Sequence, residues 1–84
     1  MDDIKERIRR FILDEYLPGE APENLTDDLP LRSSGVLDSL ATLGVARFVE
    51  KQFDVMLEAR DTGVETFDCI EDIAALVARK RASA

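Results

Sequence analysis

All three prolines of this chain fall within one stretch and divide it into regions that fold differently. Pro18, Pro22 and Pro30 belong to residues 18–37, which also hold two of the four glycines. Proline lacks a backbone N–H and is excluded from helix interiors and central strands. The sequence therefore predicts a regular segment before Pro18, a long irregular connection, and regular segments after it.

Apolar periodicity predicts that the first regular segment is a helix. Apolar side chains recur there at the i, i+4, i+7, i+8 spacing of one helical face: Ile4, Ile8, Phe11 and Ile12. Asp2 or Asp3 is expected to cap the start of this helix, and Pro18-Gly19 to end it.

A second helix is expected to begin at Asp38 or Ser39 and to run to about Phe53. Its predicted buried face has a central stripe with two flanking positions: Leu40, Leu43, Ala46, Val49 and Phe53, with Val45 and Phe48 beside them. Gly44 inside this helix costs about 1 kcal/mol relative to alanine. The sequence gives no reason for it beyond the close approach of another backbone.

The last helix has a start signal at residues 68–71. Asp68, followed three residues later by Glu71, fits a capping box with Asp in place of Ser or Thr. The expected buried face then follows: Ile70, Ile73, Ala74, Leu76 and Val77. The basic residues 79–81 favour the negative end of the helix dipole. Residues 55–63 are expected to be irregular, with a short helical turn near Val64.

The predicted fold is all-α, a small bundle of three main helices with a short additional helix and a long first loop. That loop is expected to be ordered because apolar side chains are spread along it: Leu25, Leu29, Leu31, Val36 and Leu37. Eighty-four residues make one domain, 1–84, of which residues 79–84 are expected to fray.

Composition argues against enzymatic chemistry. Histidine is absent, which removes the commonest general base and zinc ligand. The single cysteine, Cys69, is expected to be a small buried hydrophobe, because its acidic surroundings disfavour a thiolate. The sequence holds no Gly-rich phosphate loop, no metal-ligand spacing and no Ser/His or Cys/His pair. We therefore expect neither enzymatic activity nor a metal site.

The net charge of −7 favours basic protein partners over nucleic acid or anionic membranes. Residues 18–38 hold five acids against Arg32 alone, and residues 58–72 hold six against Arg60. These runs are either solvated surface or guides for docking to basic partners. With neither a signal peptide nor a membrane span in the sequence, a cytoplasmic monomer is expected.

The segment GVLDSL, residues 35–40, stands out. In its plainest reading it is a loop ending in a helix N-cap, where Asp and Ser are preferred. A serine in the first turn of a helix also presents its hydroxyl at the positive end of the dipole, which favours an attached phosphodiester. No neighbouring base activates Ser39, so it is expected to be a hydroxyl that another enzyme modifies.

Residues 35–40, followed by a helix that ends VEKQFD at residues 49–54, resemble the acyl carrier proteins and their phosphopantetheine-binding relatives. In that family an Asp-Ser-Leu motif opens the second helix, and its serine bears 4′-phosphopantetheine. DDL at residues 27–29 and TFDCIEDI at residues 66–73 are also similar to the family pattern. The similarity covers nearly the whole chain in the right order and spacing.

The resemblance implies a carrier function. A phosphopantetheinyl transferase, with magnesium, would move the arm from coenzyme A onto Ser39, with Asp38 as the acidic neighbour that contacts the transferase. The arm would hold an acyl or aminoacyl group as a thioester, loaded by a ligase and passed to downstream acyl-processing enzymes. Leu40, Arg47 and Glu50 would serve partner recognition on the second helix.

The second helix departs from the family pattern in its charge. Ala41, Gly44, Lys51 and Gln52 occupy places that are often acidic in fatty-acid carriers, and Arg47 stands where an apolar contact residue is common. These differences favour a specialised lipid or secondary-metabolite pathway. Two alternatives stay open: an aminoacyl or peptidyl carrier loaded by a separate adenylating enzyme, and an interaction module of the same fold that is never modified.

Overall fold

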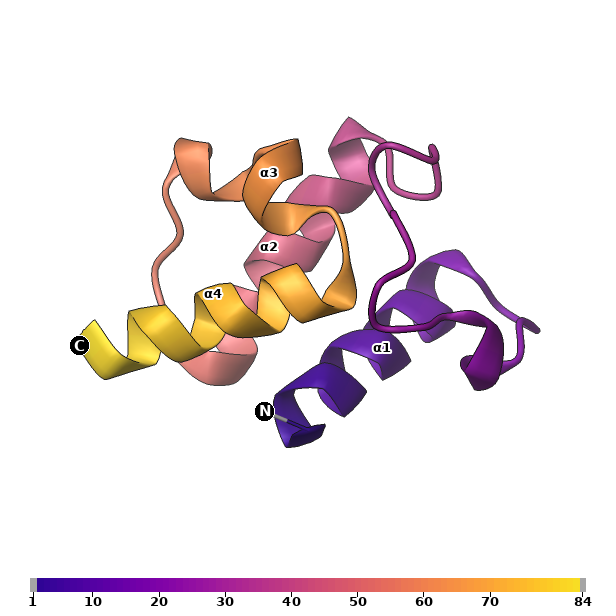
Figure 1. Cartoon of the computed structure of the whole chain (residues 1–84), viewed down its shortest axis with the longest axis horizontal. Helices are drawn as coiled ribbons and strands as arrows, with labels where there is room; N and C mark the ends of the chain where they lie inside the picture. Colours follow the sequence, from indigo (N-terminus) through magenta and orange to yellow (C-terminus); the bar gives the residue numbers. More distant parts are fainter. Residues whose placement is uncertain (1, 84) are drawn as a thin grey trace.

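The computed structural model describes residues 2–83, which form four α-helices joined by loops and two short 3-10 turns (Figure 1). The helices are α1 (Asp2–Tyr16), α2 (Ser39–Phe53), α3 (Val64–Phe67) and α4 (Ile70–Ser83). The 3-10 turns are η1 (Pro22–Asn24) and η2 (Ala59–Thr62). Residues 2–83 contain no strand, so the expectation of an all-α fold with three long helices and a short one is confirmed.

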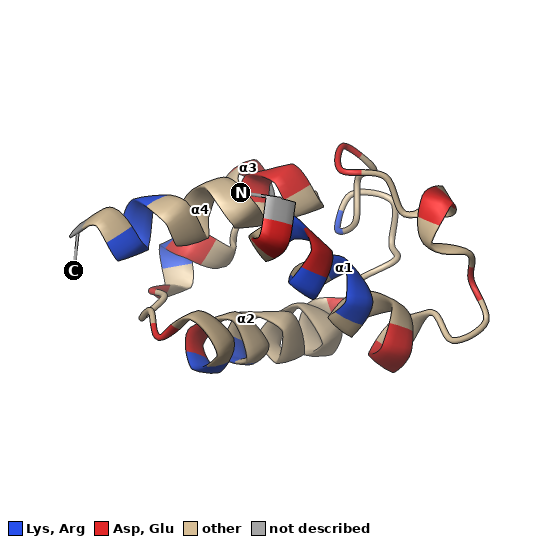
Figure 2. Cartoon of the chain, turned by 90° about the horizontal axis from the view of Figure 1, so that it is seen from below, with Lys and Arg blue, Asp and Glu red and all other residues tan. Residues whose placement is uncertain are grey.

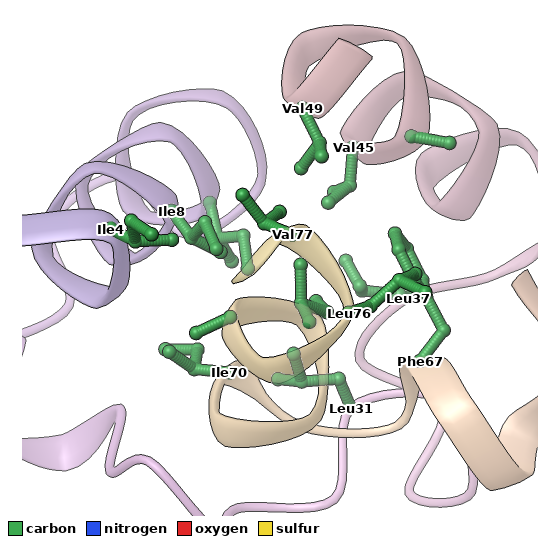
Figure 3. Packing of buried hydrophobic residues seen from close by; sticks show 14 of the residues in the cluster. Ile4, Ile8, Leu31, Leu37, Val45, Val49, Phe67, Ile70, Leu76 and Val77 are labelled. Carbon is green, nitrogen blue, oxygen red and sulfur yellow. The ribbon is translucent and has the colours of Figure 1, made fainter. Parts of the chain in front are cut away.

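The hydrophobic core lies where α1, α2 and α4 meet. Figure 3 shows side chains from these three helices converging, with Leu31 and Leu37 entering from the long loop and Phe67 from helix α3. The predicted faces of the first and last helices are buried: Ile4, Ile8 and Ile12 in α1, and Ile70, Ile73, Ala74, Leu76 and Val77 in α4. Phe11 is half-buried against this core.

The expected buried stripe of α2 is wrong at its N-terminal end. Leu40 is 79% exposed and Leu43 is 51% exposed. The rest of the prediction is confirmed for Ala46, Val49 and Phe53 and for Val45 beside them, which are buried together with Ala41 and Thr42. Both stripes keep helical spacing, and α2 carries apolar residues around most of its circumference, so periodicity alone does not decide between them.

The connection between α1 and α2 is ordered, as expected. Leu25, Leu31 and Leu37 are buried, while Leu29 and Val36 pack half-buried against the core. Helix α1 also forms ion pairs with this loop.

Lys5 Nζ lies 3.2 Å from a carboxylate oxygen of Asp27, and Arg9 forms a second ion pair with the same carboxylate. Arg9 Nε donates to the carbonyl oxygen of Leu25 at 2.9 Å. This loop is therefore part of the folded domain and gives the start of α2 a fixed support.

The predicted helix starts need two corrections. Asp2 and Asp3 both lie inside helix α1, so neither is the cap that the sequence predicts, and the Asp3 carboxylate forms an ion pair with Arg7 at 3.2 Å. Asp68 and Glu71 form no capping box, because the Asp68 carboxylate accepts hydrogen bonds from residues 32 and 33 instead. Helix α4 extends to Ser83.

Residues 54–68 lead back from α2 to α4. Asp54 ends α2 in the left-handed conformation (φ 55°), and its N–H donates to the carbonyl oxygen of Glu50. Helix α3 then packs beside α4, and turn η2 lies against α3 and α2 (Figure 1). An ion pair between Asp61 and Lys80, at 2.9 Å, ties η2 to α4. Within residues 2–83, no helix is both long and apolar enough to cross a membrane.

Candidate functional site

Ser39 is the first residue of α2 and its side chain is exposed. The preceding residue fixes the start of the helix, because Asp38 Oδ1 accepts the N–H of Ala41 at 2.8 Å. The Asp38 carbonyl oxygen accepts the backbone N–H of Thr42 at 2.9 Å and the Thr42 hydroxyl at 2.7 Å. The predicted start of the second helix is thus confirmed, with Asp38 as its N-cap.

The loop that leads to Ser39 is anchored by residues from a distant part of the sequence. The Asp68 carboxylate accepts three hydrogen bonds: from the backbone N–H of Arg32 at 2.9 Å, and from the N–H and hydroxyl of Ser33 at 3.0 and 2.9 Å. The side chain of Arg32 also donates to the carbonyl oxygen of Thr62. Residues 32–33 are therefore joined to η2 through Thr62 and to the residue that follows α3, Asp68.

These bonds change the acidity of Asp68. The pKa of its carboxyl is lowered, mainly because the backbone N–H of Ser33 stabilises the charged form, while partial burial opposes this. At neutral pH Asp68 is an anion and acts as a fixed acceptor for the loop. Sequence reasoning missed this role because Asp68 and its partners lie in different segments of the chain and no local pattern joins them.

The chemistry open to Ser39 depends on its hydroxyl and on the backbone N–H groups beside it. Among the described residues, neither its hydroxyl nor the backbone N–H groups of residues 39 and 40 have a hydrogen-bond partner. These N–H groups belong to the first turn of α2, at the positive end of its dipole. An exposed hydroxyl in this position can accept a covalently attached phosphate, whose oxygens would then face unpaired N–H donors.

The other predicted site residues lie along the outer side of α2. Leu40 is next to Ser39 and exposed, while Arg47 and Glu50 lie about two and three turns further along the helix. Arg47 is exposed, but Glu50 is half-buried, and one of its carboxylate oxygens accepts the N–H of Leu57 at 2.9 Å. The structure therefore groups Asp38, Ser39 and Leu40 at one end, with Arg47 and Glu50 apart from them.

Charge is unevenly distributed around this site (Figure 2). Helix α2 is uncharged from Ser39 to Ala46, and its charges stand at residues 47, 50 and 51. Among the described residues, the large exposed apolar side chains are Leu40, Leu43 and Met56. The first two follow Ser39 on α2, so the surroundings of Ser39 are apolar along the helix and acidic at its cap.

A groove of about 490 Å³ lies between α2 and the segment that follows it. One wall comes from α2, with Leu43, Ala46 and Arg47, and the other contains Leu57 and Ala59. The bond between Glu50 and the N–H of Leu57 holds the two walls together. The groove opens on the flank of α2 that begins at Ser39.

Cys69 is half-buried in the turn before α4. Burial raises the pKa of its thiol, and the nearby Asp72 carboxylate adds to this effect. The thiol is therefore protonated at neutral pH, but its side chain is only half-buried and not fully buried as expected. No group of three or more His, Cys, Asp or Glu side chains that could hold a metal ion is found in residues 2–83.

The side chain of Tyr16 explains why residue 44 is a glycine, for which the sequence alone gave no clear reason. A Cβ added to Gly44 would stand 2.1 Å from the Tyr16 hydroxyl oxygen and 3.5 Å from its Cζ. The close neighbour is thus an aromatic side chain from the end of α1, and not a second backbone. The pKa of Tyr16 is raised, first by burial and then by the charges of Glu15 and Asp38.

No protein-family model matches this chain, and no curated protein sequence matches it. The residues and their geometry therefore carry any proposal for its function.

Proposed function

We propose that this chain is a carrier protein that holds acyl intermediates as thioesters on a 4′-phosphopantetheine arm attached to Ser39. The observation that carries this proposal is the exposed Ser39 hydroxyl, free of hydrogen bonds to the described residues, at the first residue of a capped helix. The sequence similarity described above, over nearly the whole chain, supports it.

The residues around Ser39 suit the attached group. Its phosphodiester carries a negative charge, and the unpaired N–H groups of residues 39 and 40 lie where they favour an anion. The hydroxyl has open solvent around it, so a modifying enzyme can reach it. The role of the arm is to supply a terminal thiol that holds the cargo.

Attachment of the arm is a phosphoryl transfer. The Ser39 oxygen attacks the phosphorus that bears the pantetheine in coenzyme A, and a new oxygen–phosphorus bond forms. The bond to the nucleotide part breaks, which releases adenosine 3′,5′-bisphosphate, and the serine proton passes to a base of the transferase. Ser39 needs no base of its own for this step, which agrees with its surroundings.

The fold keeps the attachment point rigid relative to the bundle. Asp38 fixes the first turn of α2, and the Asp68 anchor holds the preceding loop. A cargo carried on Ser39 therefore moves by rotation about the bonds of the phosphopantetheine arm, while the helical bundle carries the arm between enzymes. Asp38 and Leu40, which flank Ser39 and are exposed, are our candidates for the contact with the transferase.

The neutral first half of α2 favours a specialised lipid or secondary-metabolite pathway in the cytoplasm over general fatty-acid synthesis. Partners of fatty-acid carriers are drawn to a densely acidic second helix, whereas only residues 47, 50 and 51 are charged in α2. The ligase that loads the arm would distinguish an acyl from an aminoacyl carrier.

Incubation with coenzyme A, magnesium and a broad-specificity phosphopantetheinyl transferase tests the proposal. Intact-mass analysis should show an increase equal to one phosphopantetheinyl group, and Ser39→Ala should abolish it. Ser34→Ala is the matched control, because Ser34 is another exposed serine of the same loop, and this variant should still be modified. A folded wild-type protein whose mass stays unchanged would favour the unmodified interaction module.

A further inference from the structure

Arg47 stands at the wall of the groove beside α2 without an ionic partner. It is exposed, and the ion pairs within residues 2–83 leave it out. Two acids also line the groove: Glu58 pairs with Arg60 at 2.8 Å, and Glu50, which keeps its negative charge, accepts the N–H of Leu57 at 2.9 Å and forms no ion pair with Arg47. The guanidinium of Arg47 therefore offers all its N–H donors to whatever enters the groove.

The groove lies within reach of Ser39. Ser39, Leu43 and Arg47 follow one another at i, i+4 spacing, which places them on one flank of α2. Arg47 stands about 12 Å along the helix axis from Ser39. An extended phosphopantetheine arm is longer than this, so a thioester on Ser39 can fold back along the flank to the groove.

The lining of the groove offers two kinds of contact to a cargo molecule. Leu43, Ala46 and Leu57 provide apolar walls that accommodate a short methylene chain. Arg47 provides a planar set of donors that matches a carboxylate with two parallel hydrogen bonds. An acyl group that ends in a methyl group would leave these donors unused.

For a cargo that folds back into this groove, we propose that Arg47 favours acyl groups that end in a carboxylate. The inference rests on the proposed attachment of the arm to Ser39. It makes Arg47 a residue that determines cargo specificity, and it narrows the cargo to short dicarboxylic half-thioesters. This assignment depends on the unpaired charge at the groove wall and not on the sequence similarity.

Matched cargoes test the inference. Ser39 is loaded with glutaryl- or pentanoyl-phosphopantetheine, and cleavage of each thioester by hydroxylamine is divided by the rate for the same acyl group on free pantetheine. For an exposed pair of charges, the glutaryl thioester should be protected about two- to fivefold more than the pentanoyl thioester. Backbone amide shifts at residues 43–47 and 57–59 should differ between the two cargoes.

Arg47→Gln should remove the difference between the two cargoes. Lys51→Gln is the control, because Lys51 is another exposed cation of α2 that does not line the groove, and this variant should keep the difference. Circular dichroism of both variants checks that they are folded.

Three outcomes would overturn the inference, and they are distinguishable. If Ser39 never takes up an arm, the proposed function fails and the inference fails with it. If the loaded protein protects both thioesters equally, only the inference fails. If Arg47→Gln slows modification by the transferase but leaves cargo protection unchanged, Arg47 serves a protein surface, and the assignment to cargo is wrong.

Discussion

The Tyr16 hydroxyl occupies the space where any side chain on residue 44 would have to begin. An added Cβ would lie 2.1 Å from that oxygen, closer than two such atoms can approach. Gly44 therefore permits the end of α1 to lie against the middle of α2, beside the turn that carries Ser39.

Gly44→Ala should destabilise the wild-type protein although alanine is the better helix former. The methyl group would displace the Tyr16 ring, and overpacking of this kind costs about 1–3 kcal/mol. In a Tyr16→Phe background the nearest ring atom would be Cζ at 3.5 Å, an ordinary contact. There the same substitution should stabilise by up to about 1 kcal/mol.

Urea unfolding of the wild type, Gly44→Ala, Tyr16→Phe and the double variant gives the free energy of unfolding of each protein. Equal effects of Gly44→Ala in both backgrounds would contradict the role assigned to the hydroxyl. A gain in stability on Gly44→Ala alone would show that the tyrosine side chain moves aside at little cost.

Leu37 and Leu40 make a matched pair for the corrected burial of α2. They flank Asp38-Ser39, but Leu37 is 2% exposed and Leu40 is 79% exposed. Leu37→Ala should lower the free energy of unfolding by about 2–5 kcal/mol, whereas Leu40→Ala should change it by less than about 0.5 kcal/mol. Thermal denaturation distinguishes the two. A large loss of stability in Leu40→Ala would show that Leu40 belongs to the buried face of α2, as the periodicity predicted.

Stability should fall with acid through Asp61 and Asp68. Hydrogen bonds to their carboxylates lower the pKa of both groups in the folded protein: the N–H of Glu58 and the Lys80 ammonium act on Asp61, and residues 31–33 act on Asp68. This stabilisation is complete above the ordinary aspartate pKa of about 3.9. It is lost as the pH falls through the lowered folded-state values.

Replacing both residues by asparagine should flatten that part of the pH profile, at the cost of lower stability at pH 7. Asp28→Asn is the control, because Asp28 is exposed. Unfolding curves between pH 2 and pH 7 make the comparison. A profile that is unchanged in the double variant would assign the acid sensitivity to other carboxyls.

Cys69 should react slowly with thiol reagents in the folded protein. Burial raises the pKa of its thiol, so the reactive thiolate is scarce at pH 7 and the modification rate should rise steeply with pH. In urea the rate should increase to that of a free cysteine. Alkylation followed by mass spectrometry measures both rates. Rapid modification of the folded protein at pH 7 would show that the thiol is activated.

Local signals predicted the ends of elements and the faces of two helices. Pro18-Gly19 follows the end of α1, and Asp38 caps α2, because each of these residues acts on its own neighbours in the chain. The buried face of α4 was also predictable, since its apolar residues occupy one side only.

Features that depend on contacts between distant segments were not predictable. Which face of α2 is buried depends on where α1 and α4 pack against it. The apolar residues of α2 surround most of the helix, so several rotations of α2 about its axis would bury an apolar face. Asp68 carries the pattern of a helix cap, but the N–H groups of residues 32 and 33 use its carboxylate. The reason for Gly44 lies on another helix. For the site, the sequence predicted Ser39 and its cap, but not the groove or the anchor.

The Asp68 anchor has a mechanical consequence. The loop that precedes Ser39 is hydrogen-bonded to residues 62–68. The Asp68 carboxylate accepts the N–H groups of residues 32 and 33, and the side chain of Arg32 donates to the carbonyl oxygen of Thr62. Displacement of residues 62–68 away from the loop would break these bonds, and the chain that precedes Ser39 would lose part of its support. We therefore expect any opening of this side of the bundle to increase the mobility of the Ser39 attachment point.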